Sequence, residues 1–288
     1  MRLIRTQDHV KVKRKFNFQR VTAAAAMLVL MLIAPLLYFT SESNEGAPRT
    51  GTTGEVVEKA ADGVYFGLID ENGNPYYADS NFGIPDKVSL LAPNEWIVDD
   101  YRSVGKIMIY LWGEAIDYNQ PLKELKVEGV HVKTGTKAQL ATTVITKSPF
   151  GGAEGVTSFQ PFTEPGIWNL HFSVGDKVVG EFAIEVKEPY IKIGNATILI
   201  SKQDLVAGSY ENVSIEVEGS DLPSEIELKI KDSASGAETM FTFTDKTDYS
   251  LTDGRKLSKY YGSLTVNHSG EFQFDILEQS EKVEVRLP

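Results

Sequence analysis

Apolar residues occupy every second position through most of the chain beyond residue 63, which is the spacing of half-buried β-strands. The clearest case is the segment 165–186, where two alternating runs flank Gly175-Asp176, a two-residue hairpin signal. Antiparallel strands with one solvated face have this pattern. We therefore expect a hairpin whose core-facing side chains are Trp168, Leu170, Phe172, Phe182, Ile184 and Val186.

The chain ends in an equivalent hairpin over residues 269–288, with Phe272, Phe274, Ile276, Val283, Val285 and Leu287 expected to face inward. Further strands are predicted before it at 196–200, 212–219, 225–232, 238–245 and 261–270. About seven short strands in about 100 residues are typical of an immunoglobulin-like β-sandwich. We predict such a domain over residues 189–288, closed by packing alone because the chain has no cysteine.

Another sandwich is predicted upstream, over residues 64–188, with the boundary at Pro189. A hairpin is expected around Asn72-Gly73. Apolar residues do not alternate in the run 106–112, so it is expected to be a central strand covered on both faces. Trp112 at its end is predicted to pack against Trp168 across the core. The predicted fold class is all-β, with two tandem immunoglobulin-like sandwiches, although residues 55–61 could form one or two helical turns.

Residues 21–41 are apolar throughout and carry no ionisable side chain except that of Tyr38. A helix of this length spans roughly 30 Å, the thickness of the hydrocarbon core of a bilayer. We predict a single transmembrane helix, with the lipid bilayer as its partner. A cleaved signal peptide is the alternative, but its apolar region normally runs only about 7 to 15 residues. Residues 42–63, rich in small and polar side chains, are interpreted as a flexible linker.

Charge along the chain predicts the orientation. Residues 1–20 hold seven basic side chains and one acidic one, whereas the remainder holds 22 basic and 39 acidic residues, a formal charge of −17. The positive-inside rule predicts a cytoplasmic tail over residues 1–20 and an extracellular C-terminus. Nucleic acid is excluded as a partner of the acidic part, because phosphate contacts require a basic surface.

The absence of cysteine removes several kinds of chemistry: a disulfide framework, a thiolate metal site, a cysteine nucleophile and the lipidated cysteine of a bacterial lipoprotein. The histidines also lack the spacing of a zinc site. We expect them to be exposed strand or turn residues: His9, His131, His171 and His268. No catalytic, cofactor-binding or metal-binding residue is predicted.

Two acidic stretches invite comparison with calcium sites. Residues 70–74 (DENGN) do not fit an EF-type loop, because Gly73 is the fourth residue and Asn81 the twelfth, where that loop needs glycine at the sixth and glutamate at the twelfth. A hairpin turn explains them better. Asp245, Asp248 and Asp253 are interpreted as part of a solvated connection, with calcium as the alternative.

Residues 94–105 combine two aromatic side chains, Trp96 and Tyr101, with several charged ones. Such a loop can form a binding surface at the end of a sandwich. Insertion of Trp96 into the core is the favoured alternative. The motifs of nucleotide-binding loops and of serine hydrolases do not occur.

The strand 105–113 (GKIMIYLWG), the segment 125–137 (LKVEGVHVKTGTK) and the hairpin 165–186 carry a resemblance to a known family. They resemble the immunoglobulin-like domain of a family of bacilli surface proteins of unknown function, many of them lipoproteins. The resemblance covers about residues 80–188 and implies no catalytic residues. Here the hydrophobic helix would replace the lipidated cysteine.

We therefore expect a membrane-anchored binding, adhesion or envelope protein that is not an enzyme and needs no cofactor, with an extracellular protein or an envelope polymer as its partner. The first alternative is the sensory ectodomain of a membrane regulator of the anti-sigma type, although 20 residues before the span are too few for a zinc-type anti-sigma domain. The second alternative is a secreted hydrolase or protease inhibitor, since sandwich loops can host either.

Overall fold

A computed structural model of the protein describes residues 57–69, 74–91, 93–113, 123–251 and 253–288. These residues form 18 strands. The all-β prediction is confirmed. No helix among them is long and apolar enough to cross a membrane, and the predicted span at 21–41 lies outside them.

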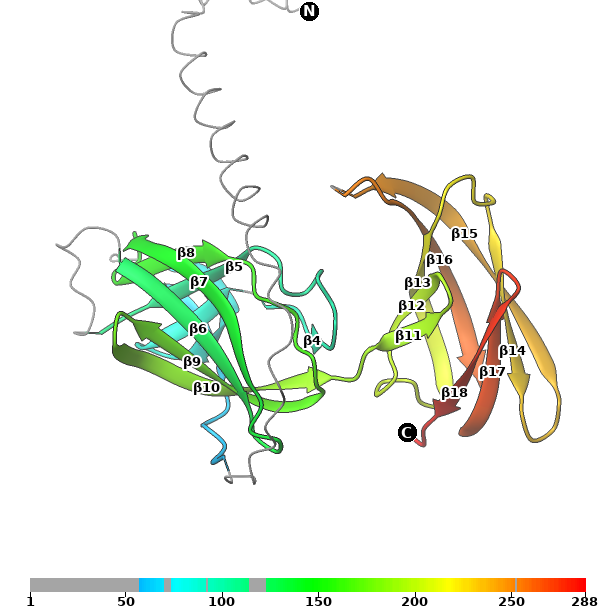
Figure 1. The fold of residues 1–288 in the computed structure, drawn as a ribbon, viewed down its shortest axis with the longest axis horizontal. Helices are drawn as coiled ribbons and strands as arrows, with labels where there is room; N and C mark the ends of the chain where they lie inside the picture. The colour runs from blue at the N-terminus through cyan, green and yellow to red at the C-terminus, as the bar shows by residue number, and fades with distance from the viewer. Residues whose placement is uncertain (1–56, 70–73, 92, 114–122, 252) are drawn as a thin grey trace, which may run out of the picture. The chain divides into compact units, whose positions relative to one another are not determined.

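The first ten strands form one sheet that folds over into two layers (Figure 1). Strand β7 joins the layers, because it pairs with β6 along most of its length and with β8 at Thr146 and Lys147. The strand order is β1 (Val64–Ile69), β2 (Pro75–Ile84), β3 (Val88–Leu91), β5 (Ile107–Leu111), β8 (Ala153–Thr157), β7 (Lys137–Lys147), β6 (Lys123–His131), β9 (Gly166–Val174), β10 (Lys177–Lys187) and β4 (Trp96–Ile97).

The last eight strands repeat this plan (Figure 1). Here β15 joins the layers, pairing with β14 through its first half and with β16 through its second. The strand order is β11 (Tyr190–Ile193), β12 (Ala196–Ser201), β13 (Gly208–Glu218), β16 (Lys256–Val266), β15 (Glu238–Ser250), β14 (Ile226–Asp232), β17 (Gly270–Ile276) and β18 (Gln279–Val285).

Both orders are those of an immunoglobulin-like sandwich, whose strands A, B, E and D form one layer and C, F and G the other. In the N-terminal sandwich β3, β5, β8 and β7 correspond to the first layer, and β6, β9 and β10 to the second. In the C-terminal sandwich the same places belong to β12, β13, β16 and β15, and to β14, β17 and β18. Each sandwich also pairs its last strand in parallel with a short upstream segment, at Trp96–Ile97 in one and at Val206 in the other.

The turn between β6 and β7 and the corresponding turn between β14 and β15 have the same hydrogen bonds. The Gly135 amide donates to the carbonyl of His131 at 2.8 Å, and the Gly236 amide donates to that of Asp232 at 2.8 Å. The two glycines have φ values of 70° and 73°, the left-handed region that glycine adopts without steric cost. The internal likeness therefore extends beyond the two final hairpins in which the sequence showed it.

Each sandwich closes around its own cluster of buried side chains. The predicted inner faces of the two hairpins are buried, with Trp168 and Phe274 both 0% exposed. Leu287 was expected inward but is 76% exposed, because the final strand ends at Val285. The central strand β5 is covered on both faces, as predicted.

Two other expectations were wrong. Trp112 stacks on Tyr110, whereas Trp168 contacts Phe162 and His131, so the two tryptophans do not meet. Residues 57–61 form no helix, and the chain lies extended against β9 and β10. The hairpin between β1 and β2 is confirmed by their antiparallel pairing, although its turn at 70–73 lies outside the described residues.

Candidate functional site

The histidines are dispersed, and one of them corrects the prediction that all would be exposed. His131 is only 3% exposed. His171 lies on β9 beside Glu181, with 2.9 Å between Nδ1 and Oε2. His268 is exposed near Asp232, and His9 lies outside the described residues. Within the described part of the chain, no three histidine or acidic side chains are grouped so as to hold a metal ion.

His131 has a structural role in the turn after β6. Its Nδ1 accepts a hydrogen bond from the Thr134 amide at 3.1 Å, so the proton of the neutral ring resides on Nε2, which donates to the Pro165 carbonyl at 3.1 Å. Thr136 and Thr134 donate to the Glu164 carboxylate. These hydrogen bonds, that from Thr136 foremost, lower the pKa of Glu164. The cluster ties the turn to the chain entering β9.

Trp96 is inserted in the core, which confirms the alternative favoured for this residue. Its ring stacks on Phe159 with centroids 5.7 Å apart, and it is 5% exposed. Of the remaining aromatic and charged residues of this loop, Tyr101 is 76% exposed, while Asp100 is buried and accepts a hydrogen bond from Arg102. The loop therefore contributes more to the core than to a binding surface.

The acidic stretch around Asp245, Asp248 and Asp253 is not the connection that the sequence suggested, because β15 continues to Ser250. Asp253 holds the following turn by accepting hydrogen bonds from the amide and the side chain of Arg255. Asp248 faces a polar hollow together with serine and lysine side chains. The calcium alternative at residues 70–74 lies almost wholly outside the described residues.

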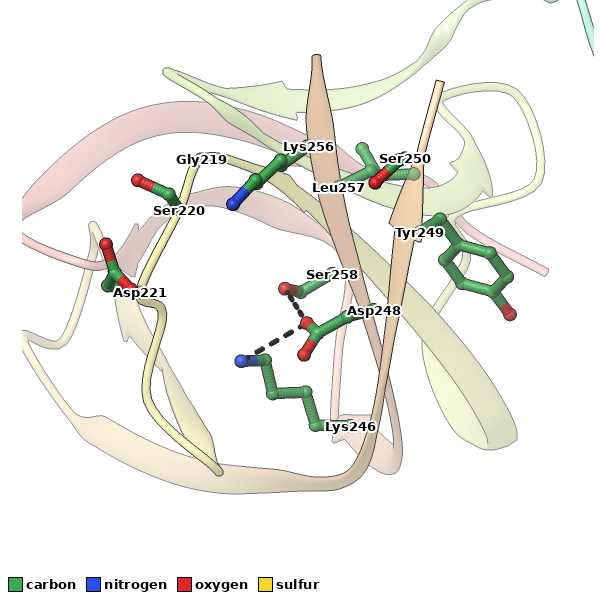
Figure 2. A pocket seen from close by; sticks show the side chains of 10 residues that line it. All are labelled: Gly219, Ser220, Asp221, Lys246, Asp248, Tyr249, Ser250, Lys256, Leu257 and Ser258. Carbon is green, nitrogen blue, oxygen red and sulfur yellow. Dashed lines mark hydrogen bonds and ion pairs between the residues drawn. The ribbon is translucent and has the colours of Figure 1, made fainter. Parts of the chain in front are cut away.

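This polar hollow is the candidate functional site (Figure 2). Its volume is about 280 Å³. It lies where the β15–β16 hairpin faces the chain after β13, and it is lined by Gly219, Ser220, Asp221, Lys246, Asp248, Tyr249, Ser250, Lys256, Leu257 and Ser258. Strand alternation explains the lining, since positions 246, 248 and 250 of β15 share one face.

An ion pair between Lys246 and Asp248 lines the hollow, with the Asp248 side chain 68% exposed. Ser258 donates to Oδ1 of Asp248 at 2.5 Å, and the Lys246 ammonium lies 3.2 Å from the same oxygen. Lys246 also donates to the Leu222 carbonyl at 2.9 Å. The hydrogen bond from Ser258, with that from Lys246, lowers the pKa of Asp248.

The remaining polar groups of the hollow are available to a ligand. Figure 2 shows the ammonium end of Lys256 reaching over the hollow and the Tyr249 ring turned away from it. The side chains of Lys256 and Asp221 make no hydrogen bond or ion pair within the described residues. Ser220 and Ser250 add two hydroxyls, each able to donate and accept.

Two further hollows lie on the N-terminal sandwich. One, of about 590 Å³, separates residues 57–61 from the outer face of β6, β9 and β10 and contains the His171–Glu181 pair. Residues 57–61 are held there by Asn169, which accepts from the Ala60 amide at 2.9 Å and donates to the Glu58 carbonyl at 2.7 Å. The other, of about 200 Å³, lies beside Tyr65 and Trp96.

Comparison with known proteins finds neither a family model nor a curated protein that matches the chain. Solved structures do match. A teleost fish polymeric Ig receptor (pIgR) ectodomain is 12% identical over 63% of this chain and 90% of its own, with a TM-score of 0.26. A marsupial T cell receptor is 9% identical over 70% and 95%, with a TM-score of 0.22, and bovine butyrophilin is 12% identical over 72% and 97%, with a TM-score of 0.20.

These TM-scores are too low to carry an argument about this chain. The immunoglobulin-like assignment follows from the strand order of the two sandwiches. The fold is immunoglobulin-like.

The hollow was not predicted from the sequence. Its residues come from the end of β13 and from both strands of a hairpin, up to 39 positions apart, and the pairing of β15 with β16 brings them together. The alternation of polar residues in 246–250 was the available signal, but the stretch was interpreted as a connection.

Proposed function

We propose that the protein is a single-pass membrane protein whose two immunoglobulin-like sandwiches bind an extracellular protein or an envelope polymer, without catalytic activity. The observation that carries the proposal is the uncharged apolar segment 21–41 between a basic tail and an acidic remainder. Its length matches the bilayer core, and its flanking charges favour a cytoplasmic N-terminus. The resemblance of about residues 80–188 to bacilli surface proteins favours the same location.

Binding is the role that the fold supports best. Immunoglobulin-like sandwiches present loops and strand faces on a rigid body, and such positions commonly carry binding residues. The formal charge of −17 beyond residue 20 disfavours an anionic partner surface.

Cysteine labelling would test the location, because the chain has no cysteine of its own. Leu287→Cys lies at an exposed position near the C-terminus. In intact cells, a membrane-impermeant maleimide should label this variant at once, and His9→Cys only after lysis. Labelling of His9→Cys in intact cells, or protection of Leu287→Cys, would contradict the proposal. A released C-terminal fragment would instead support a cleaved signal peptide.

One observation favours the sensory ectodomain of a membrane regulator as a second candidate. Residues 57–63 are fixed to the N-terminal sandwich by Asn169 and by backbone hydrogen bonds with Ala183. A mechanical load on this sandwich, or a ligand that changes its conformation, would therefore displace the chain that leads to the membrane. A photo-crosslinker at His9 should then capture one defined cytoplasmic protein, and the absence of any adduct would argue against this candidate.

A further inference from the structure

The polar hollow of the C-terminal sandwich offers hydrogen-bond donors and acceptors together. Lys256 supplies donors, Oδ2 of Asp248 supplies an acceptor, and the hydroxyls of Ser220 and Ser250 supply both. Vicinal hydroxyl groups need this combination, because each of them donates one hydrogen bond and accepts others. We infer that the hollow binds one neutral sugar unit of an envelope polysaccharide. This inference rests on the proposed extracellular location.

The charges of the hollow favour a neutral ligand over an ion. Two ammonium groups, of Lys246 and Lys256, balance two carboxylates, of Asp221 and Asp248. An anion in the hollow would be repelled by the two carboxylates, and a cation would be repelled by the two ammonium groups. A ligand without charge avoids both repulsions and still uses the strong hydrogen bonds that charged partners make.

The Lys246–Asp248 pair is preorganised, so among the charged groups of the hollow binding has to order only the side chains of Lys256 and Asp221. Ser258, which holds Asp248, is 3% exposed, and Lys246 is fixed at both Asp248 and the Leu222 carbonyl. The rim is fixed by the backbone, where the Gly219 amide donates to the Lys256 carbonyl at 3.0 Å. Preorganisation of this kind lowers the entropic cost of binding.

The size of the hollow fits a single sugar unit. Its volume of about 280 Å³ is at the small end of ligand pockets, which run from roughly 300 to 1,000 Å³ for drug-sized molecules. One unit of a longer chain can therefore enter while its neighbours remain in solvent.

The test uses the full chain in phosphatidylcholine nanodiscs, which contain no sugar headgroups. Calorimetric titration with chitotetraose and with cellotetraose should reveal binding of at least one of them. Lys256→Met and Asp248→Asn should each weaken that binding by about tenfold, the effect of losing roughly one charge-assisted hydrogen bond. The controls are Lys259→Met on the same strand, which faces Glu216, and Asp253→Asn, which holds the next turn. Both should bind like the unaltered protein.

Three results would overturn the inference: no binding of either tetrasaccharide, binding that Lys256→Met and Asp248→Asn leave unchanged, or stronger binding of poly(glycerol phosphate), an anionic polymer. Circular dichroism of each variant would exclude unfolding as the cause of a loss. Because nanodiscs expose both sides of the membrane, this result does not depend on orientation. Failure of the sugar site and failure of the proposed location would therefore be seen separately.

Discussion

At the scale of single residues, His131 and Asp232 show two different side chains in one role. Each begins the turn after the corresponding strand, and each accepts the amide hydrogen of the residue three positions on, Thr134 or Ser235. In the sequence alone, the stretches around His131 and Asp232 are not alike, and a histidine and an aspartate suggest no common role. Only the hydrogen bonds of the two turns show that they are equivalent. Their equivalence explains why His131 is buried, since its ring holds the turn after β6.

His131→Ala should lower the free energy of unfolding by about 2–4 kcal/mol, because it removes contact with Trp168 and leaves the Thr134 amide and the Pro165 carbonyl without partners. His131→Asn, which retains an acceptor, should lose less. Urea unfolding followed by tryptophan fluorescence would measure both. The exposed His268→Ala lies in the C-terminal sandwich, which has no tryptophan, so it is followed by far-ultraviolet circular dichroism and should stay within about 0.5 kcal/mol. An equally small effect of His131→Ala would show that the cluster is dispensable.

At the scale of elements, strand patterns were predictable where one face is buried and one is solvated. The hairpins β9–β10 and β17–β18 fall where alternation put them, because a shift of one residue would expose every core side chain. Alternation did not show that β15 continues to Ser250, since its second half leaves one layer and pairs in the other. Alternation also could not predict which residue Trp112 contacts, because the side chain of a tryptophan near a strand end can turn to either face of the sheet.

The segment 57–61 is an element that only tertiary contacts create. It lacks a strand pattern, and Asn169 supplies the hydrogen bonds that a neighbouring strand would otherwise provide. Asn169 is 2% exposed. Sequence alone could not identify such a partner more than 100 positions away.

Asn169→Ala should release residues 57–61 while the sandwich stays folded. The Lys59–Ala60 bond would then become accessible, and endoproteinase Lys-C should cleave it much faster than in the unaltered protein, as followed by mass spectrometry. Asn195→Ala is the matched control, because this asparagine makes its hydrogen bonds in the C-terminal sandwich. Equal cleavage rates in the Asn169 and Asn195 variants would mean that Asn169 does not hold the segment.

At the scale of the molecule, the two clusters of buried side chains predict two unfolding units. All three tryptophans, Trp96, Trp112 and Trp168, belong to the N-terminal sandwich, so their fluorescence reports on that sandwich alone. Each cluster contains fully buried phenylalanines, such as Phe172 and Phe274. The division can therefore be tested without separating the sandwiches.

Phe274→Ala should destabilise the C-terminal sandwich by about 3–5 kcal/mol, the usual cost of a large cavity. Far-ultraviolet circular dichroism should then show an earlier transition, while the midpoint of tryptophan fluorescence stays in place. Phe172→Ala should shift the fluorescence midpoint instead. If Phe274→Ala moved the fluorescence midpoint as far as Phe172→Ala does, the two sandwiches would unfold as one unit.

The parallel pairing of entering and leaving segments has a mechanical consequence. In the N-terminal sandwich, Asp62 and Trp96–Ile97 lie beside β10, and in the C-terminal sandwich Val206 lies beside Arg286 after β18. Tension that pulls the start and the end of a sandwich apart would load these hydrogen bonds side by side, in shear, so that several must rupture together. Under such tension, each sandwich would thus resist stretching most strongly at these parallel pairs.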